Sequence, residues 1–132
     1  MELNWLPLKD HGDETCKLVA VEGGMDIPFA VERVYYFCQA DPAAHRGGHA
    51  HKALRQVFIC LHGSCTMLLD NGAERQEVRL DNPCQGLYVG GGIWREVYDF
   101  TPDAVLLALT DRHYSEDDYI RDYEEFLQWV KA

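Results

Sequence analysis

The sequence lacks long apolar runs, an export signal and closely paired cysteines. No stretch of its 132 residues approaches the roughly 18–20 apolar residues that span a bilayer. Residues 1–5 contain no basic region followed by an apolar stretch, so we expect no secretory signal and a cytoplasmic protein. The five cysteines are odd in number and form no C-x-x-C pair, which favours reduced thiols over a disulfide framework. We expect Cys38 and Cys60, which lie in apolar runs, to be small core residues.

The sequence is also poor in positive charge. With 12 Lys and Arg against 22 Asp and Glu, its formal net charge is −10. Non-specific nucleic-acid binding needs a basic face, so we expect no nucleic-acid partner and no membrane partner. An anionic small ligand would need a locally basic pocket within this unfavourable field. Arg33, Arg46 and Arg95 are the candidates for that pocket.

What the sequence does contain is a series of short β-strand patterns. No linker, repeat or low-complexity segment interrupts it, so we expect one domain over 1–132. Turn signals separate apolar, β-branched and aromatic runs at 31–37, 56–61, 64–69, 77–80, 87–89, 93–100 and 104–109. The sequence Asp70-Asn71-Gly72 predicts a hairpin with a type I′ turn. This spacing predicts an all-β sandwich or barrel.

The C-terminal part has a helical pattern instead. Ser115 stands at the N-cap position of a predicted helix, with Asp118 three residues on and acidic residues in the first turn. Apolar residues then recur at helical spacing at 119, 120, 123, 126, 127 and 130. We expect this apolar face to pack on the outside of the barrel.

The segment Arg46-Gly47-Gly48-His49-Ala50-His51 carries the main chemical signal. Alternate residues of a strand point the same way, so His49 and His51 share a face. Two imidazoles inside a barrel can bind a metal or transfer protons. The alternative is that both face solvent at a sheet edge.

The ligands of a metal site can be checked on the sequence. His49 and His51 resemble the H-x-H start of the first cupin motif, whose glutamate position holds Gln56 here. The histidine of the second motif is replaced by Arg95. An amide is a poor substitute for a carboxylate, and a guanidinium cannot ligate a cation. Two imidazoles fall short of the three protein ligands usual at a catalytic zinc, so we expect no metal and no other cofactor.

The strand around Arg33 adds a second signal. Arg33 and Tyr35 share one face, and Tyr36 takes the other. A buried Arg without a partner is costly, so an inward Arg33 would be explained by an anionic ligand. The alternative, an outward Arg33 paired with Glu32 or another acid, is equally open on this strand alone.

Several blocks in order resemble one family, the sugar nucleotide 3,4-ketoisomerases, over about 18–126. The matching blocks are Arg33-Val34-Tyr35-Tyr36, Arg46-Gly47, His49-Ala50-His51-Lys52, Leu61-His62-Gly63-Ser64-Cys65, Gly86-Leu87-Tyr88-Val89-Gly90, Trp94 and Asp118-Tyr119-Ile120-Arg121. The resemblance implies an RmlC-like, jelly-roll cupin barrel with a C-terminal α-helix, metal-free and homodimeric. It implies a substrate, dTDP-4-keto-6-deoxy-D-glucose, whose carbonyl moves from C4 to C3 on routes to 3-amino-3,6-dideoxyhexoses.

The resemblance also suggests roles for individual residues. His49, His51 and Tyr35 match active-site positions, and Arg33 and Arg46 fall where the family contacts the substrate or its diphosphate. We expect the remaining substrate-binding residues to be Gln56, Tyr88, Trp94 and Arg95. The chain departs from the family around Asp13-Glu14-Thr15-Cys16, which leaves the galacto or gluco product open.

The expected chemistry is general acid–base catalysis through an enediol or enediolate. We expect His51 to be the base at the sugar and His49 its partner, although the sequence does not order them. A deoxysugar 3,5-epimerase, a metal cupin oxygenase and a non-catalytic sugar-binding cupin are the alternatives.

Overall fold

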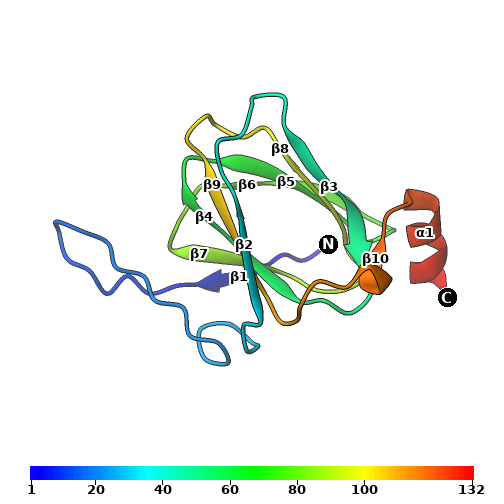
Figure 1. Ribbon diagram of the computed structural model, residues 1–132, viewed down its shortest axis with the longest axis horizontal. Helices are drawn as coiled ribbons and strands as arrows, with labels where there is room; N and C mark the ends of the chain where they lie inside the picture. Colours follow the sequence, from blue (N-terminus) through cyan, green and yellow to red (C-terminus); the bar gives the residue numbers. More distant parts are fainter.

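Two five-stranded antiparallel sheets enclose the interior of the molecule (Figure 1). The computed structural model describes residues 1–132. The strands are β1 (Asn4–Pro7), β2 (Arg33–Phe37), β3 (His45–His51), β4 (Gln56–His62), β5 (Cys65–Asp70), β6 (Arg75–Leu80), β7 (Gln85–Val89), β8 (Trp94–Tyr98), β9 (Val105–Thr110) and β10 (Tyr119–Ile120). A 3-10 helix (Glu116–Asp118) and α1 (Tyr123–Lys131) complete the chain. The sheet orders are β1-β7-β4-β9-β2 and β10-β3-β8-β5-β6, so consecutive strands of the chain often lie in opposite sheets.

The interior between the sheets is filled by alternate residues of the strands. Phe58 and Cys60 of β4 meet Met67 and Leu69 of β5 and Leu106 of β9, and all five are at most 3% exposed. The predicted strands between 31 and 109 are all present as β2 and β4–β9, because their β-branched and aromatic residues suit a pleated, half-buried surface. The short strands β1 and β10 were not predicted.

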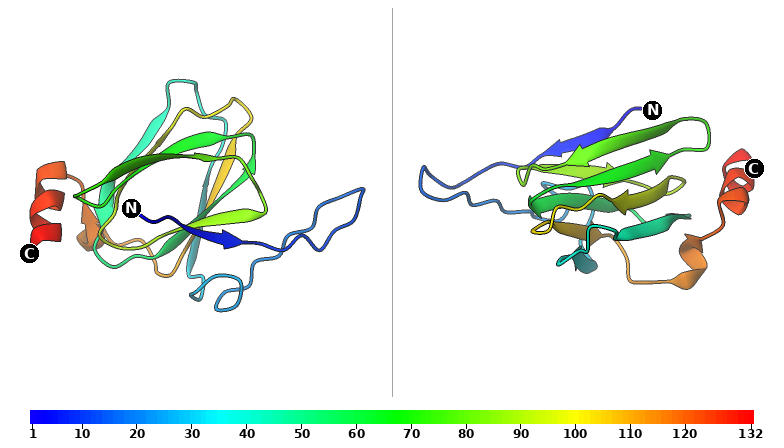
Figure 2. Two further views of the ribbon diagram at one scale, coloured as in Figure 1. Left: turned by 180° about the vertical axis from the view of Figure 1, so that it is seen from behind. Right: turned by 90° about the horizontal axis from the view of Figure 1, so that it is seen from above.

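The outer face of each sheet is covered by a different segment. Ile27 and Phe29, from the segment between β1 and β2, pack on Val57 and Ile59 of the first sheet. On the second sheet, α1 places Phe126 in a buried cluster that contains residues of β3, β8 and β10. The two views in Figure 2 show α1 beside the barrel, on its outside, as predicted.

The predicted start of the C-terminal helix was wrong. Ser115 makes no side-chain capping bond, and α1 begins at Tyr123 with Asp122 as its N-cap, accepting from the backbone N–H of Glu125. The carboxylate of Asp118 is used elsewhere, by backbone N–H groups of residues 53 and 54. These long-range hydrogen bonds and the pairing of β10 with β3 outweigh the local helix signal.

The hairpin at Asp70-Asn71-Gly72 is present, but its turn type was wrong. The loop between β5 and β6 has four residues. A type I′ turn requires a positive φ at both central residues, and Asn71 does not have one. The Asn71 side chain instead accepts from the backbone N–H groups of Ala73 and Glu74. Cys60 is buried as predicted, whereas Cys38 is exposed, which contradicts its assignment to the core.

The segment between β1 and β2 contains the loop that lies furthest from the barrel (Figure 1). An isolated bridge between Asp10 and Val19 closes this loop at its base. Leu18 in this loop and Met25, further along the segment, are 62% and 79% exposed. No helix of the structure is long and apolar enough to cross a membrane.

Candidate active site

A bulge in β3 places the histidine pair. The register of β3 against β8 shifts between Gly47 and His49, and Gly47 and Gly48 have φ of 86° and 77°. A Cβ on Gly47 would lie 2.7 Å from the backbone oxygen of Arg95, so only glycine fits this approach of the two strands. Beyond the bulge, His49 pairs directly with Arg95. Directly paired residues share a face, and both side chains line a cavity inside the barrel.

His49 and His51 lie side by side, as their spacing predicted. Their ring centroids are 5.0 Å apart with the rings nearly perpendicular, and Tyr119 of β10 lies 4.9 Å from one and 4.4 Å from the other. His51 is 3% exposed, which rules out the alternative of a solvent-facing pair.

Asp118 holds His51 in place. Its Oδ2 lies 3.1 Å from Nδ1 of His51, and the same carboxylate accepts from the backbone N–H groups of Ala53 (2.8 Å) and Leu54 (3.2 Å). A carboxylate accepts hydrogen bonds, so Nδ1 of neutral His51 carries the proton and Nε2 keeps its lone pair. Asp118 was not among the predicted site residues, because its position three residues after Ser115 matched a helix start. The matching block that begins at Asp118 was the available signal.

The surroundings keep both imidazoles neutral. Burial, and then the charge of Arg95, lower the pKa of His49 to about 3. The same two causes lower the pKa of His51 to about 4, against the opposing effect of Asp118. At neutral pH each ring can therefore accept a proton.

Arg95, Gln56 and Tyr35 form a buried hydrogen-bonded chain beside the histidines. The Nη1 of Arg95 donates to Oε1 of Gln56, and Nε2 of Gln56 donates to the Tyr35 hydroxyl at 2.8 Å. The other guanidinium donors bind the backbone oxygens of Gly90 and Ile93. Burial lowers the pKa of Arg95 to about 10, so the side chain remains charged at neutral pH.

A cavity of about 180 Å³ opens against this group, and it is lined by cationic and aromatic side chains. Arg33 lines it together with Tyr35, which settles the orientation of that strand in favour of the inward alternative. The guanidinium of Arg33 lies 4.9 Å from the Tyr35 ring centroid. Arg46 and Arg95 also line the cavity, so the predicted basic pocket exists in an acidic chain. His49 is on the cavity wall, whereas His51 lies behind it.

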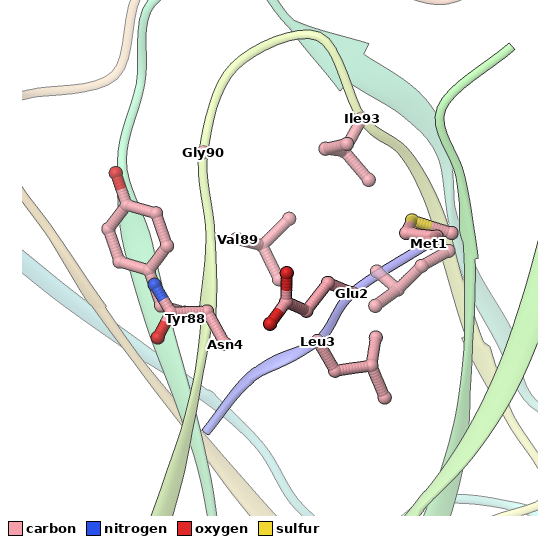
Figure 3. A pocket seen from close by; sticks show the side chains of 9 residues that line it. Met1, Glu2, Leu3, Asn4, Tyr88, Val89, Gly90 and Ile93 are labelled. Atoms are coloured by element: carbon pink, nitrogen blue, oxygen red, sulfur yellow. The ribbon is translucent and has the colours of Figure 1, made fainter. Parts of the chain in front are cut away.

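Two residues predicted to bind substrate lie elsewhere. Trp94 alternates with Arg95 along β8 and points outward, into the cluster under α1 with Phe126. Tyr88 of β7 also points outward and lines a separate cavity of about 230 Å³ together with the N-terminal residues (Figure 3). The Glu2 carboxylate in that cavity would repel a diphosphate. Trp94 and Tyr88 therefore do not line the cavity beside His49, and their contact with the substrate stays a prediction.

The polar residues of the site do not fit a metal ion. No three His, Cys, Asp or Glu side chains gather in a possible ligand set. The two cupin ligand positions that differ here, Gln56 and Arg95, are bonded to each other. The Arg95 charge would also repel a cation bound by His49 and His51.

The chain is similar to proteins of known activity over nearly its whole length. The family model FdtA (WxcM-like, C-terminal) matches residues 1–131. The TDP-4-oxo-6-deoxy-alpha-D-glucose-3,4-oxoisomerase of Aneurinibacillus thermoaerophilus is 44% identical over 130 residues, which cover 98% of this chain and 94% of the relative.

Solved structures give the same picture. The 3,4-ketoisomerase QdtA of Thermoanaerobacterium thermosaccharolyticum, a histidine-to-asparagine mutant in complex with TDP-4-keto-6-deoxyglucose, is 41% identical with a TM-score of 0.95. The match covers 98% of this chain and 94% of that chain. WlaRB, a TDP-quinovose 3,4-ketoisomerase of Campylobacter jejuni, is 40% identical with a TM-score of 0.90, covering 96% and 97%. The predicted RmlC-like cupin fold with a C-terminal helix is thereby confirmed. The chain belongs to the FdtA family of sugar nucleotide 3,4-ketoisomerases and is an isomerase of the intramolecular oxidoreductase class.

Proposed function

We propose that the protein converts dTDP-4-keto-6-deoxy-D-glucose into a dTDP-3-keto-6-deoxyhexose by histidine-mediated proton transfer. The observation that carries this proposal is the pair of neutral imidazoles, His49 and His51, set beside a cationic cavity. The relatives that act on TDP-linked 4-keto-6-deoxyglucose support the choice of substrate.

The size and charge of the cavity fit this substrate. Pockets for drug-sized ligands measure about 300–1,000 Å³, and this cavity of about 180 Å³ suits one sugar ring. The diphosphate and nucleoside would then lie at the mouth. Arg33 and Arg46 supply charges that suit a diphosphate, because guanidinium groups bind phosphate oxygens in pairs.

The reaction moves two hydrogens and needs no external oxidant. A base takes the C3 proton, which the C4 ketone acidifies, and the electrons form an enediolate with negative charge on O4. Protonation of O4 gives the enediol. Loss of the O3 proton and delivery of a proton to C4 then place the carbonyl at C3. C3 is oxidised and C4 is reduced, so the substrate is its own redox partner.

The two histidines divide this work. His49 lines the cavity and takes the C3 proton, in place of His51, to which the sequence analysis gave that role. His51, oriented by Asp118, stands 5.0 Å from His49 between ring centroids and relays protons for O3 and O4. Tyr35 lies on the same cavity and hydrogen-bonds the oxygen on which charge develops.

The decisive test is incubation with dTDP-4-keto-6-deoxyglucose in D₂O, followed by NMR. We expect a 3-keto product with deuterium delivered to C4 and an unlabelled C5. Label at both C3 and C5 of a 4-keto product would identify a 3,5-epimerase instead. Binding of dTDP without any turnover would identify a non-catalytic sugar-binding protein. Loss of activity in EDTA, restored by a divalent ion, would overturn the metal-free mechanism.

The same spectra give the product configuration. The face of C4 that receives the proton decides between 3-keto-6-deoxygalactose and 3-keto-6-deoxyglucose. A ketone at C3 is the functional group that an aminotransferase requires, so we place the reaction on a route to 3-amino-3,6-dideoxy sugars.

We also propose that the protein is a homodimer. Val34 and Tyr36 of the edge strand β2 point away from the barrel interior and are 53% and 65% exposed. Exposed apolar side chains beside a sheet edge are a suitable contact for a second copy. Sedimentation analysis should give twice the mass of 15.1 kDa, and a monomer at micromolar concentration would contradict the proposal.

A further inference from the structure

Gln56 occupies a position where the chemistry of its neighbours fixes the direction of its amide. The side chain is 0% exposed at the start of β4, between Arg95 and Tyr35. A guanidinium has only donors, so the Gln56 atom that faces Arg95 must be the amide oxygen. The amide nitrogen then faces Tyr35.

This direction passes on to the tyrosine. An amide nitrogen can only donate, so the Tyr35 oxygen accepts the 2.8 Å hydrogen bond from Gln56. The Tyr35 O–H group is therefore not used by Gln56. Tyr35 lines the same cavity as His49, and burial raises the pKa of its hydroxyl, which stays protonated.

We propose that Arg95 and Gln56 act as positioning residues that make Tyr35 an obligatory hydrogen-bond donor toward the sugar. The inference rests on the proposed isomerase function and adds roles for two residues that were expected only to bind substrate. In the enediolate, the oxygen at C4 gains negative charge, and a donor fixed beforehand stabilises that charge without reorganisation. The buried chain supplies the orientation, because the Arg95 guanidinium can only donate and so fixes first the amide of Gln56 and then the accepting side of the Tyr35 hydroxyl.

The same geometry explains why a carboxylate would not serve at position 56. A glutamate would still pair with Arg95, but its second oxygen could only accept a hydrogen bond. The Tyr35 O–H would then turn toward the introduced carboxylate and away from the cavity. Glutamine and glutamate at position 56 are nearly equal in size, and both can pair with Arg95. They differ in the direction of the hydrogen bond to Tyr35.

Gln56→Glu is therefore the sharpest test, because it reverses that hydrogen bond and keeps an ion pair with Arg95. We expect kcat to fall about 10²-fold, which is the loss on removing one donor to a developing oxyanion. The kcat of Tyr35→Phe should fall by a similar factor. The double variant Gln56→Glu with Tyr35→Phe should lose no more than Tyr35→Phe alone, because both changes remove the same donor. KM should change less than kcat in all three.

Matched controls separate this role from other effects. Gln128→Glu, the same change on the exposed face of α1, should leave kcat unchanged. Assays in EDTA exclude a metal site created by the new carboxylate. The pH profile of Gln56→Glu should keep its shape at a lower level, whereas a new charge acting on the histidines would shift it. Gln56→Met, which removes the amide but leaves the Tyr35 hydroxyl free to rotate, should lose less than Gln56→Glu.

The outcomes separate the two proposals. Wild-type kcat in Gln56→Glu, or losses that multiply in the double variant, would overturn the positioning role while leaving the isomerase function intact. A larger loss of kcat in Gln56→Met than in folded Gln56→Glu would also overturn the positioning role. A wild-type protein that does not isomerise the substrate would overturn the proposed function, and this inference with it.

Discussion

The two ends of the barrel interior are built from the same strands and differ in chemistry. Toward one end β4 and β9 present Cys60 and Leu106, which pair with each other and belong to one apolar cluster. At the other end, Gln56 is the first residue of β4 and Arg95 is the second residue of β8. Strand register brings the polar residues together, since Gln56 pairs with Thr110, Arg33 pairs with Thr110, and His49 pairs with Arg95.

The difference shows how a small barrel can carry a reactive interior. The apolar end stabilises the fold by burial, at about 25 cal/mol per Å². The polar end buries less apolar surface and gains less from this effect. Its polar groups are bonded to one another instead, and no buried side-chain N or O atom lacks a hydrogen-bond partner. Changes at the polar end should therefore alter the reaction, and changes at the apolar end should alter stability.

His49→Asn should give the largest effect and test the polar end. We expect kcat to fall about 10³-fold, equivalent to about 4 kcal/mol, because in the proposed mechanism the imidazole on the cavity wall takes the C3 proton. The melting temperature should stay within a few degrees of wild type. Turnover on the keto sugar and circular dichroism check the two parts. Near-normal turnover would remove His49 from the role of base and return it to His51.

Leu106→Ala tests the apolar end. Leu106 is fully buried, so the substitution leaves a cavity and should lower the free energy of unfolding by about 3 kcal/mol. The kcat per folded molecule at low temperature should remain that of wild type, because Leu106 is not part of the cavity wall. Urea unfolding and an active-site titration measure both quantities. A large loss of kcat in fully folded protein would contradict the division between the two ends.

Sequence alone predicted β2, β4–β9 and the inward face of β3, because period-two patterns follow directly from strand geometry. It could not show that Arg95 bonds Gln56, since this contact joins residues 39 positions apart. Asp118 was missed for the same reason, because its partner His51 is 67 positions away. Trp94 was assigned to the site on family resemblance, although its alternation with Arg95 along β8 already placed it on the opposite face of the strand. A local sequence pattern therefore predicts which face of a strand a residue takes, but it does not predict contacts between residues far apart in the chain.

The pH dependence of stability gives a smaller effect at the polar end. Both histidines have a folded pKa of about 3 to 4, against 6.5 in the unfolded chain. Between about pH 4 and 6.5 the unfolded chain binds protons that the folded protein does not, so stability falls as the pH falls. Each histidine should contribute about 1.4 kcal/mol per pH unit in this window. Urea unfolding of wild type and His51→Asn at pH 7 and 5 should show a shallower fall in the variant. Equal slopes would mean that His51 is not held neutral.

Trp94→Phe should give the smallest effect, and it tests the outer face of the strand that carries Arg95. The change removes the 2.9 Å hydrogen bond from Trp94 Nε1 to Glu96 and trims the packing on Phe126. One hydrogen bond lost near the surface should cost about 1 kcal/mol of unfolding free energy. KM and kcat should stay within about twofold of wild type, because Trp94 points away from the cavity that Arg95 lines. A large rise in KM with little loss of stability would instead place Trp94 at the substrate, and the two faces of β8 would no longer be separate in function.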